Sequence, residues 1–547
     1  MEHSGLGATS IQAPDLGDGT QQVLAQEAAS YRAARLRLRR LVPRAGLVGV
    51  LAWAVGVAFR DCLVWAEDAR DAFVYHLHAV SPWAFGWLLA VVVPGCMVSV
   101  WLVRRFAPEA AGSGIPHLKA IMHGARDLAG WRVLPIKFLG GVLGIGCGMA
   151  LGREGPTTQM GGALGQMLAD AMEMGPRERL TLIAAGAGAG LTAAFNAPIA
   201  GTIFVLEEMQ RDFTPGVFVA TLVATVIADA VTRVLSHSQE AVIAIPVFQT
   251  PPMAVVGPCL ILGGLAGLLG VLYNRGLLLS LDVLPRLGWR GPMLVGISVA
   301  VSAYFYPSLV GGGRSVIDHL DSLHFGFGML VAIWLLRYLL TMLCYGSGAP
   351  GGLFAPLLVL GALLGLGVGQ AVHACWPSLD VAPAVYAVVG MAAYFTAIVR
   401  APLTGIILIV EMTSNYNLTL PLLVGSLAAY GVAEWLDDEP IYEALLERDL
   451  RQSRGGMTLP EAMEVEVKVY AGSAFDGVAV KDLGLPPGCV LITVRRGLRT
   501  IVPNGQTVLQ AWDRLTAVVG PNSAAGMLAL RQGTVLSKSK DAAETVS

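Results

Sequence analysis

Gly152-Arg153-Glu154-Gly155-Pro156 places an arginine and a glutamate inside a long, otherwise apolar part of the chain. Because charges are costly inside a bilayer, an ionisable residue in such a place indicates a functional site. Pro156 suits the first position of a helix, and the glycines let the backbone approach a ligand closely. We therefore expect a helix N-terminus within the membrane, where unpaired N–H groups and the helix dipole favour an anion.

Glu154 is itself an anion tethered at this helix start. The simpler interpretation is that Arg153 and Glu154 only pair with each other. The pentapeptide alone leaves both interpretations open.

The composition is that of a polytopic membrane protein. Of 547 residues, 54% are hydrophobic and 14% charged, and the mean hydropathy is +0.62, far from the values of an ordinary soluble protein. Apolar runs cover about 45–436. Since a span takes roughly 20 residues, this part has room for more than about ten segments, some of them short or broken.

Charge and cysteine usage exclude several other classes. A net charge of −2 with a pI near 6.5 gives no reason to expect nucleic-acid binding. The seven cysteines are scattered singly, so we interpret them as packing residues and expect neither disulfides nor a metal site. No cofactor is expected. The polar N-terminus has no short apolar run with a cleavage site, so it is not a secretory signal.

The N-terminal region changes from polar to basic before the first span. Residues 1–24 indicate a flexible tail, and 25–44 are predicted to form a helix rich in arginine. The positive-inside rule keeps such arginines cytoplasmic, and they could also contact the lipid surface. The predicted spans lie at about 45–65, 82–103, 215–235, 253–280, 291–309 and 418–436, and the first two should form a helical hairpin.

Two further turns repeat the pattern of a glycine-rich helix start. In Gly112-Ser113-Gly114-Ile115-Pro116, Ser113 could donate its hydroxyl to an anion or simply cap the following helix. The turn 346–356 carries no charged residue. Its Phe354 could line or gate a path, or only pack.

Three polar side chains close apolar segments. Glu207 and Glu208 end one segment, where paired carboxylates are usually interfacial. Tyr442 follows the last span and could donate a hydrogen bond or serve as an interfacial anchor.

The chain is internally duplicated. At an offset of 200 residues the first half matches the second, and four inserted residues extend the match. The aligned pairs are Gly152 with Gly352, Pro156 with Pro356, Gly161 with Gly361, Gly165 with Gly365, Ala197 with Ala401, Pro198 with Pro402, Gly201 with Gly405 and Glu207 with Glu411. Duplicated transporter halves place substrate sites at the repeat interface, between the N-termini of broken helices.

Taken together, these motifs resemble the CLC family of chloride channels and chloride/proton antiporters, over about residues 31–450. The set consists of G-S-G-I-P at 112, G-R-E-G-P at 152 and G-G-L-F-A-P at 351, with Tyr442 closing the membrane part. The resemblance implies an all-α fold of two inverted repeats of tilted, broken helices. It also implies a homodimer in which each subunit holds its own ion path.

The resemblance assigns roles to individual residues. It implies that Ser113 and Tyr442 donate hydroxyls to a central chloride, with backbone N–H groups around Phe354 and Ala355 completing the site. Glu154 resembles the gating glutamate, which occupies an anion position when ionised and leaves it when protonated. Both states are physically sensible, because the same helix ends stabilise the acid and chloride.

The same resemblance favours an antiporter over a passive channel. Family antiporters carry an intracellular proton relay at the position of Glu208, the second of the Glu207-Glu208 pair, so the resemblance implies that Glu208, with Glu207 beside it, forms this relay. Ser113 resembles the chloride-selective members, and Pro156 with Tyr442 argues against the fluoride-exporting branch. His117 departs from the acidic residue common after the first motif, and leaves the local pairing and pH response open.

The C-terminal part is predicted to be a small α+β domain with strands at 465–470, 490–494, 499–502 and 516–519. It resembles the RCK-C (TrkA-C) lobe of potassium-transport regulators rather than paired CBS domains. The motifs that carry this resemblance are Gly472-Ser473, Asp482-Leu483-Gly484-Leu485-Pro486, Arg495-Arg496 and Val502-Pro503-Asn504-Gly505. It implies a module that senses an unidentified small ligand or braces a dimer.

These interpretations divide the chain into five parts. They are a cytoplasmic tail and basic helix (1–43), a transmembrane domain (44–445, with halves of about 44–240 and 250–445), a linker (446–463), the cytosolic RCK-C-like domain (464–531) and a disordered tail (532–547).

The predicted function is that of a proton-coupled chloride antiporter, not an enzyme, in the inner cell membrane with both termini cytoplasmic. Its partners are chloride, protons, the lipid bilayer and a second copy. A gated chloride channel of the same family is the alternative. An intramembrane hydrolase using Ser113 or Ser347 is remote, since neither H-E-x-x-H nor G-x-S-G occurs. A potassium transporter would need a T-V-G-Y-G type filter, which the chain lacks.

Overall fold

The computed structural model describes residues 18–80, 83–236, 243, 245–313, 316–317, 326–452, 463–497, 499–520 and five positions between 526 and 534. For residues 18–37, 79, 80, 236, 452, 463 and 464 it describes the backbone only. The predicted N-terminal tail up to residue 17, linker residues 453–462 and the end of the chain after residue 534 lie outside these residues.

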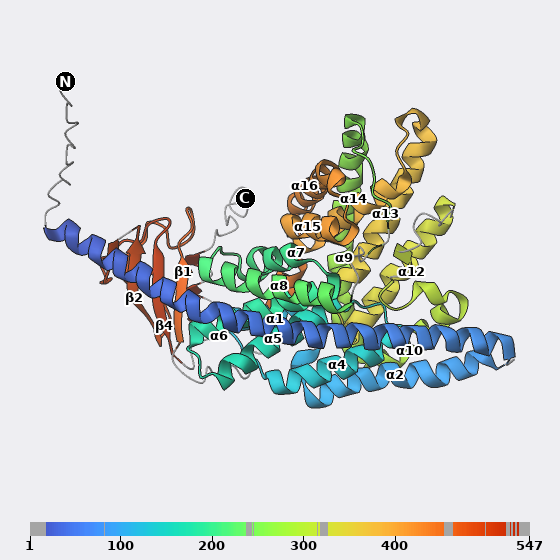
Figure 1. The fold of residues 1–547 in the computed structure, drawn as a ribbon, viewed down its shortest axis with the longest axis horizontal. Coiled ribbons are helices and arrows are strands. Elements are labelled where there is room, and N and C mark those ends of the chain that lie inside the picture. The colour runs from blue at the N-terminus through green and yellow to red at the C-terminus, as the bar shows by residue number, and fades with distance from the viewer. Residues whose placement is uncertain are drawn as a thin grey trace, which may run out of the picture.

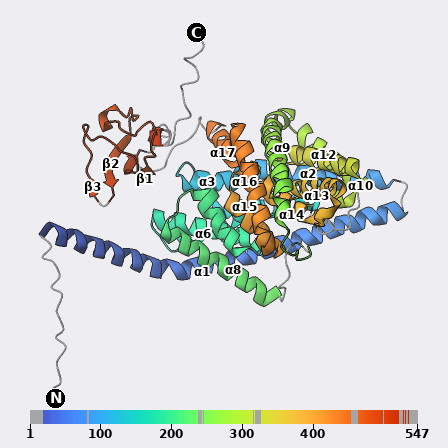
Figure 2. The same cartoon turned by 90° about the horizontal axis from the view of Figure 1, so that it is seen from above.

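The membrane part consists of helices in two successive halves (Figures 1 and 2). The first half contains α1 (Asp18–Val80), α2 (Ala84–Phe106), α3 (Ile115–Met122), α4 (Gly130–Gly146), α5 (Glu154–Ala171), α6 (Pro176–Phe195), α7 (Pro198–Phe204), the π-helical turn η2 (Val205–Gln210) and α8 (Pro215–Ser236). The second contains α9 (Val256–Val283), α10 (Arg290–Phe305), α12 (Phe327–Gly346), α13 (Phe354–Cys375), α14 (Pro383–Val399), α15 (Pro402–Thr413), α16 (Thr419–Trp435) and α17 (Ile441–Gln452).

Among the described residues, seven helices are long and apolar enough to cross a membrane, and three apolar helices are shorter. Short and broken helices are what the glycine-rich turns predict. Helix α17 runs to Gln452, so the linker begins later than residue 446.

Helix α1 differs from the sequence-based expectation of a basic helix followed by a span at 45–65. It is one continuous helix of 63 residues, about 95 Å long at 1.5 Å per residue. Neither glycine nor proline occurs between Gly56 and Pro82, so no helix breaker stops it at residue 65. Figure 1 shows α1 running along the longest axis of the molecule, with α2 returning beside it as the predicted hairpin.

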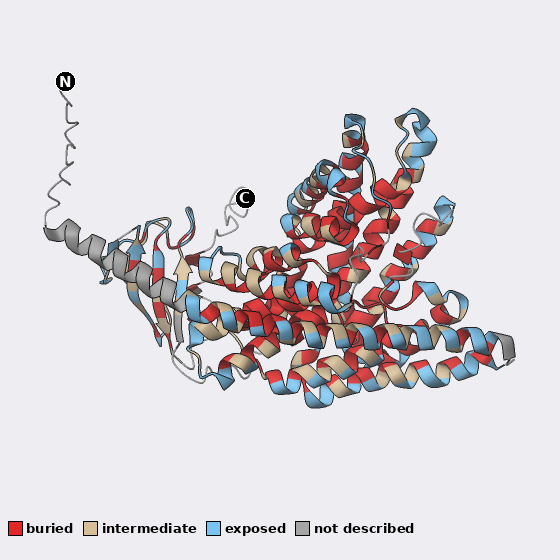
Figure 3. Ribbon diagram, viewed as in Figure 1, coloured by how far each residue is buried: buried red, intermediate tan, exposed pale blue. Residues whose placement is uncertain are grey.

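The most extensively packed helix pairs are α5 with α6 and α13 with α14, one in each half. A Cβ atom at Gly161 would collide with the carbonyl of Gly186, and one at Gly361 with the carbonyl of Gly390. The repeated glycines therefore mark equivalent close crossings. Figure 3 shows buried residues concentrated in the middle of the helical body, around these pairs.

The C-terminal domain is a four-stranded antiparallel sheet of order β1-β4-β2-β3. The strands are β1 (Met463–Lys468), β2 (Cys489–Arg496), β3 (Arg499–Ile501) and β4 (Arg514–Val519), each overlapping a predicted strand. Phe475 and Tyr470 donate backbone hydrogen bonds to Gly533 and Thr534. The ordered domain thus reaches into the predicted disordered tail, because two residues assigned to that tail complete the domain's backbone bonding.

Candidate functional site

The three glycine-rich turns come together at a seam between the halves. Gly152 and Gly352 exchange two backbone hydrogen bonds, of 2.8 and 2.7 Å. Beside them, Gly112 donates to Ala349 at 3.1 Å and accepts from Gly351 at 3.0 Å. Two isolated β-bridges thereby hold together turns that are 200 residues or more apart in the sequence.

Glu154 lies at this seam as the first residue of α5, fully buried. Its Oε1 accepts a 3.0 Å hydrogen bond from the backbone N–H of Ala355, the second residue of α13. Its Oε2 has no hydrogen-bond partner among the described residues. The carboxylate of one half therefore occupies the helix start of the other, where the helix dipole favours negative charge. A simple Arg153–Glu154 pair does not describe this arrangement.

Gly352 permits that contact. A Cβ atom there would lie 2.6 Å from Glu154 Oε1 and 2.7 Å from the backbone nitrogen of Gly155. The glycine is thus required by a close approach of backbone and carboxylate.

Ser113 is buried in the turn before α3, and its Oγ accepts from the N–H of Ile115 at 3.2 Å. The Ser113 hydroxyl thus accepts from the N–H of the first residue of α3, although the N-cap position of that helix is Gly114. Its backbone N–H donates to the hydroxyl of Tyr345 at 3.3 Å. Tyr345, at the end of α12, is a third hydroxyl at this place that sequence reasoning missed.

Tyr442 is fully buried at the start of α17, so the interfacial-anchor interpretation is wrong. Its hydroxyl has no partner among the described residues. Its ring centroid lies 6.2 Å from that of Phe354, whose ring also makes edge contacts with Phe204 and Phe395 at 5.5 and 4.7 Å. Phe354 thus packs among aromatic rings beside the seam.

Lys137 holds the loop that leads to Ser113. The fully buried ammonium donates to the carbonyls of Ala110 at 2.9 Å and Gly112 at 2.6 Å. Sequence reasoning noted Lys137 only as a charge near the edge of an apolar run.

His117, the departure from the family pattern, is buried on α3. Its Nδ1 lies 3.2 Å from Nε2 of Gln159, which also donates to the carbonyl of Glu109 at 2.8 Å. The residue is thus part of a polar contact between α3 and α5.

Glu208 is buried within the turn η2, and the interfacial interpretation is wrong for it. The ammonium of Lys119 donates to Glu208 Oε1 at 2.6 Å and to Glu443 Oε1 at 2.8 Å. Arg211 also reaches Glu443 Oε1, at 3.0 Å. The predicted relay residue is therefore part of a network that spans α3, η2 and α17.

Glu207 points elsewhere than its neighbour. Its carboxylate accepts from the N–H groups of Leu403 and Thr404 at 3.1 and 2.7 Å, and from the Thr404 hydroxyl at 2.7 Å. These groups begin α15, so Glu207 caps a helix of the second half. The structure separates Glu207 from Glu208, which the sequence had grouped together.

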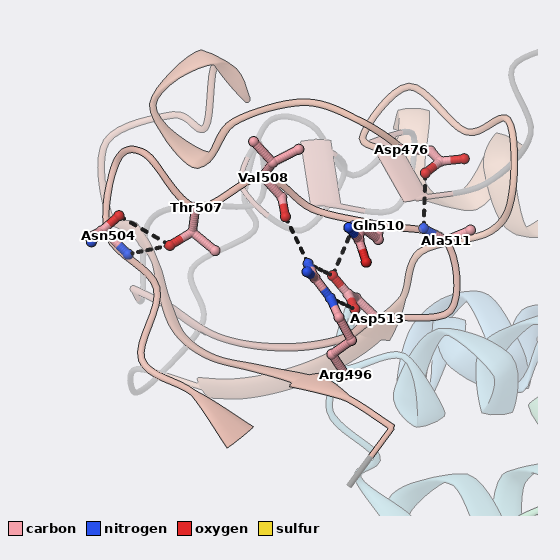
Figure 4. A network of polar contacts seen from close by, with 8 residues as sticks. All are labelled: Asp476, Arg496, Asn504, Thr507, Val508, Gln510, Ala511 and Asp513. Atoms are coloured by element: carbon pink, nitrogen blue, oxygen red, sulfur yellow. Dashed lines mark hydrogen bonds and ion pairs between the residues drawn. The ribbon is translucent and has the colours of Figure 1, made fainter. Parts of the chain in front are cut away.

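A polar network braces the C-terminal domain (Figure 4). The Arg496 guanidinium makes a bidentate pair with the fully buried Asp513, at 2.9 and 2.7 Å, and also donates to the carbonyl of Val508. The Asp513 carboxylate raises the pKa of Arg496. The network thus holds the loop before β4 against the end of β2.

The fold and these turns define the class of protein. A profile described as "Voltage gated chloride channel" matches residues 95–434, which is more than half of the chain. The chain therefore belongs to the voltage gated chloride channel (CLC) family. A TrkA-C domain profile matches residues 464–530. Both family resemblances seen in the sequence are confirmed.

Individual relatives are similar over about three quarters of this chain. The "H(+)/Cl(-) exchange transporter ClcA" of Vibrio cholerae is 42% identical over 422 residues, covering 75% of this chain and 89% of the relative. The ClcA of Klebsiella pneumoniae is 39% identical over 435 residues, covering 76% and 92%.

Solved structures agree with this assignment. The structure of a slow cyanobacterial Cl−/H+ antiporter is 37% identical with a TM-score of 0.72, covering 76% of this chain and 98% of that chain. A eukaryotic CLC transporter, at 24% identity and a TM-score of 0.64, covers 76% of this chain and 74% of that one, and supports the fold alone.

Proposed function

We propose that this protein is an antiporter that moves chloride against protons across the membrane. The observation that carries the proposal is the Glu154 carboxylate bound to the N–H of Ala355 at the start of α13. An acid at that place can be exchanged for an anion, because both are stabilised by the same backbone groups. Relatives at 39–42% identity named as H+/Cl− exchangers support the same function.

In this proposal one residue couples the two ions. Ionised Glu154 occupies the start of α13 and keeps chloride out. A proton on the carboxylate removes the negative charge that holds the Glu154 side chain there. Chloride then takes the N–H groups around Phe354 and Ala355. The buried hydroxyls of Ser113 and Tyr442 complete the anion site. For Tyr442 we infer this from its hydroxyl, which has no partner among the described residues.

Glu208 is the proposed proton relay on the intracellular side of the protein. It is a buried ionisable residue next to the start of α17, which bears Tyr442, and intramembrane carboxylates typically serve proton paths. Glu207 had been paired with it as a relay, but three hydrogen bonds from α15 already engage its carboxylate. We therefore assign Glu207 a structural role.

The remaining features of the proposal concern assembly and location. We propose a homodimer in the inner membrane with one ion path per subunit, and with both termini and the C-terminal domain cytoplasmic. The two units stay as proposed, with α17 continuing the transmembrane domain (44–445) to Gln452 and with Met463, Gly533 and Thr534 added to the C-terminal domain (464–531). We propose that the C-terminal domain senses a small ligand or braces the dimer. A passive chloride channel gated by Glu154 is the second candidate.

The test is proton movement into liposomes that contain the purified protein, driven only by a chloride gradient with the membrane potential set to oppose passive proton flow. Uphill proton flux is expected. Glu154→Ala should retain chloride flux without proton flux, and Glu208→Gln should lose proton flux more selectively. Chloride flux without any proton flux in the unmodified protein would make it a channel.

A further inference from the structure

The fully buried Lys119 lies between two carboxylates from different elements. Its ammonium is 2.6 Å from Glu208 Oε1 and 2.8 Å from Glu443 Oε1. Lys119 comes from α3, Glu208 from η2 and Glu443 from α17. Burying a lysine with no exposed surface costs free energy unless the ammonium is paired. The two carboxylates therefore stabilise Lys119 in its buried position.

The two carboxylates differ in their access to water. The Glu208 side chain is 1% exposed, whereas that of Glu443 is 28% exposed and that of its second partner, Arg211, 47%. Glu443 is therefore the solvent-facing acid of this cluster and Glu208 the buried one, and Lys119 contacts both. The charges of the two acids and two bases cancel.

Other titratable groups near Glu208 are few. Helix α3 contributes Lys119, His123 follows that helix, Arg211 follows η2, and α17 contributes Tyr442 and Glu443. The buried face of α6, which packs on η2, has Thr192 as its one polar side chain. Glu207 is engaged at α15.

We propose that Glu443 is the solvent-facing entry residue for protons that reach Glu208, and that Lys119 is the residue that positions both acids. This rests on the proposed function and extends its proton path by two residues. Sequence reasoning assigned neither of them a role.

The transfer needs no group besides these and water. Glu443 takes a proton from the internal solution and becomes neutral, so Lys119 is attracted to the ionised Glu208 alone. When that proton passes to Glu208, Glu443 is again the anion and Lys119 moves toward it. The ammonium keeps its three hydrogens throughout, and its small shift follows the negative charge from one carboxylate to the other.

The central variant is Glu443→Gln, which keeps the shape of the side chain and removes its proton-binding capacity. The matched control is Asp449→Asn, because Asp449 is on the same helix and pairs with Arg126 at 2.9 Å. In the chloride-driven liposome assay, Glu443→Gln should slow proton flux at least tenfold at neutral internal pH. Chloride flux should fall less, and Asp449→Asn should behave as the unmodified protein.

The Lys119 variants separate positioning from packing. Lys119→Met leaves Glu208 without its cation, so Glu208 should accept protons more readily. The internal pH of half-maximal proton flux should then rise by about one unit. Lys119→Arg should restore the original pH profile, which a purely structural role would not require.

The outcomes are distinguishable. Unchanged proton flux in Glu443→Gln across internal pH, or an equal loss in Asp449→Asn, would overturn the entry role. An unshifted pH profile in a folded Lys119→Met protein would overturn the positioning role. If the unmodified protein or Glu208→Gln shows that protons are not coupled through Glu208, the proposed function itself fails.

Discussion

Glu207 and Glu411 hold equivalent places in the two halves, and each caps a helix of the other half. Glu207 caps α15 in the second half, and Glu411 caps α7 in the first. Glu207 accepts from the N–H groups of Leu403 and Thr404, and Glu411 accepts from those of Ile199 and Ala200 at 3.1 and 2.8 Å. The inverted repeat is thus joined by a reciprocal exchange of helix caps. Neither half satisfies these helix starts by itself.

Removing either cap should cost stability rather than coupling. Glu207→Gln or Glu411→Gln should each lower the free energy of unfolding by about 1–2 kcal/mol, since a charged cap accepts two N–H bonds. Thermal unfolding in detergent measures this effect. Glu447→Gln is the control, because its pair with Arg451 is exposed. Loss of proton coupling in Glu207→Gln alone would return Glu207 to the relay.

Gly352→Ala should displace the Glu154 carboxylate. The added Cβ would lie 2.6 Å from Oε1, where backbone on the other side prevents relaxation. We expect chloride-driven proton flux to fall at least tenfold in liposomes. Gly264→Ala is the control, because a Cβ there would meet nothing within 4 Å. Normal coupling in a folded Gly352→Ala protein would contradict this geometry.

Tyr345→Phe should leave the Ser113 backbone N–H without its 3.3 Å acceptor. A buried donor left unsatisfied costs about 1–3 kcal/mol, so thermal stability should fall, and chloride binding measured by calorimetry should weaken. Tyr386→Phe is the matched control, since the Tyr386 hydroxyl has no partner among the described residues. Equal effects of both substitutions would show that the Tyr345 hydroxyl has no special role.

Arg496→Met should destabilise the C-terminal domain by about 2–3 kcal/mol, because the buried Asp513 loses its cation. The hydrogen bonds from Asp513 raise the pKa of Arg496 above its already high usual value. The stabilisation that depends on Arg496 being charged is therefore complete below that value and is not lost as pH rises from about 5 to 9. Hydrogen exchange of β2 and β4 in the full chain measures both effects.

For Arg496→Met, the control is Arg495→Met, whose contact with Glu466 is long, at 3.7 Å, and exposed. Equal exchange in the two variants would show that the Asp513 pair adds no stability.

The sequence predicts the parts of the site that depend on local patterns. The turns around Ser113, Glu154 and Phe354 have their own glycine and proline signatures, and the offset of 200 indicates that they meet. Helix α1 was predicted too short because an apolar window ends near residue 65, whereas helix propensity continues to Pro82.

Contacts between distant side chains have no such signature. Tyr345 meets Ser113 across 232 residues, and Lys119 meets Glu443 across 324. In one sequence Tyr345 is indistinguishable from an aromatic packing residue. Lys119 did carry a signal, since a lysine soon after Gly112-Ser113-Gly114 within an apolar helix needs a partner, but the partner's identity depends on the fold.

The contact between Glu154 and Ala355 also fixes an order of events during synthesis. These residues are 201 positions apart, so at about 5–20 residues per second the ribosome needs about 10–40 s between them. For that time the first half holds an acid in the membrane without the helix start that receives it. The Glu154–Ala355 contact is therefore completed only after part of the second half has been made, and a chain stalled before residue 355 would have Glu154 without the helix start that receives its carboxylate.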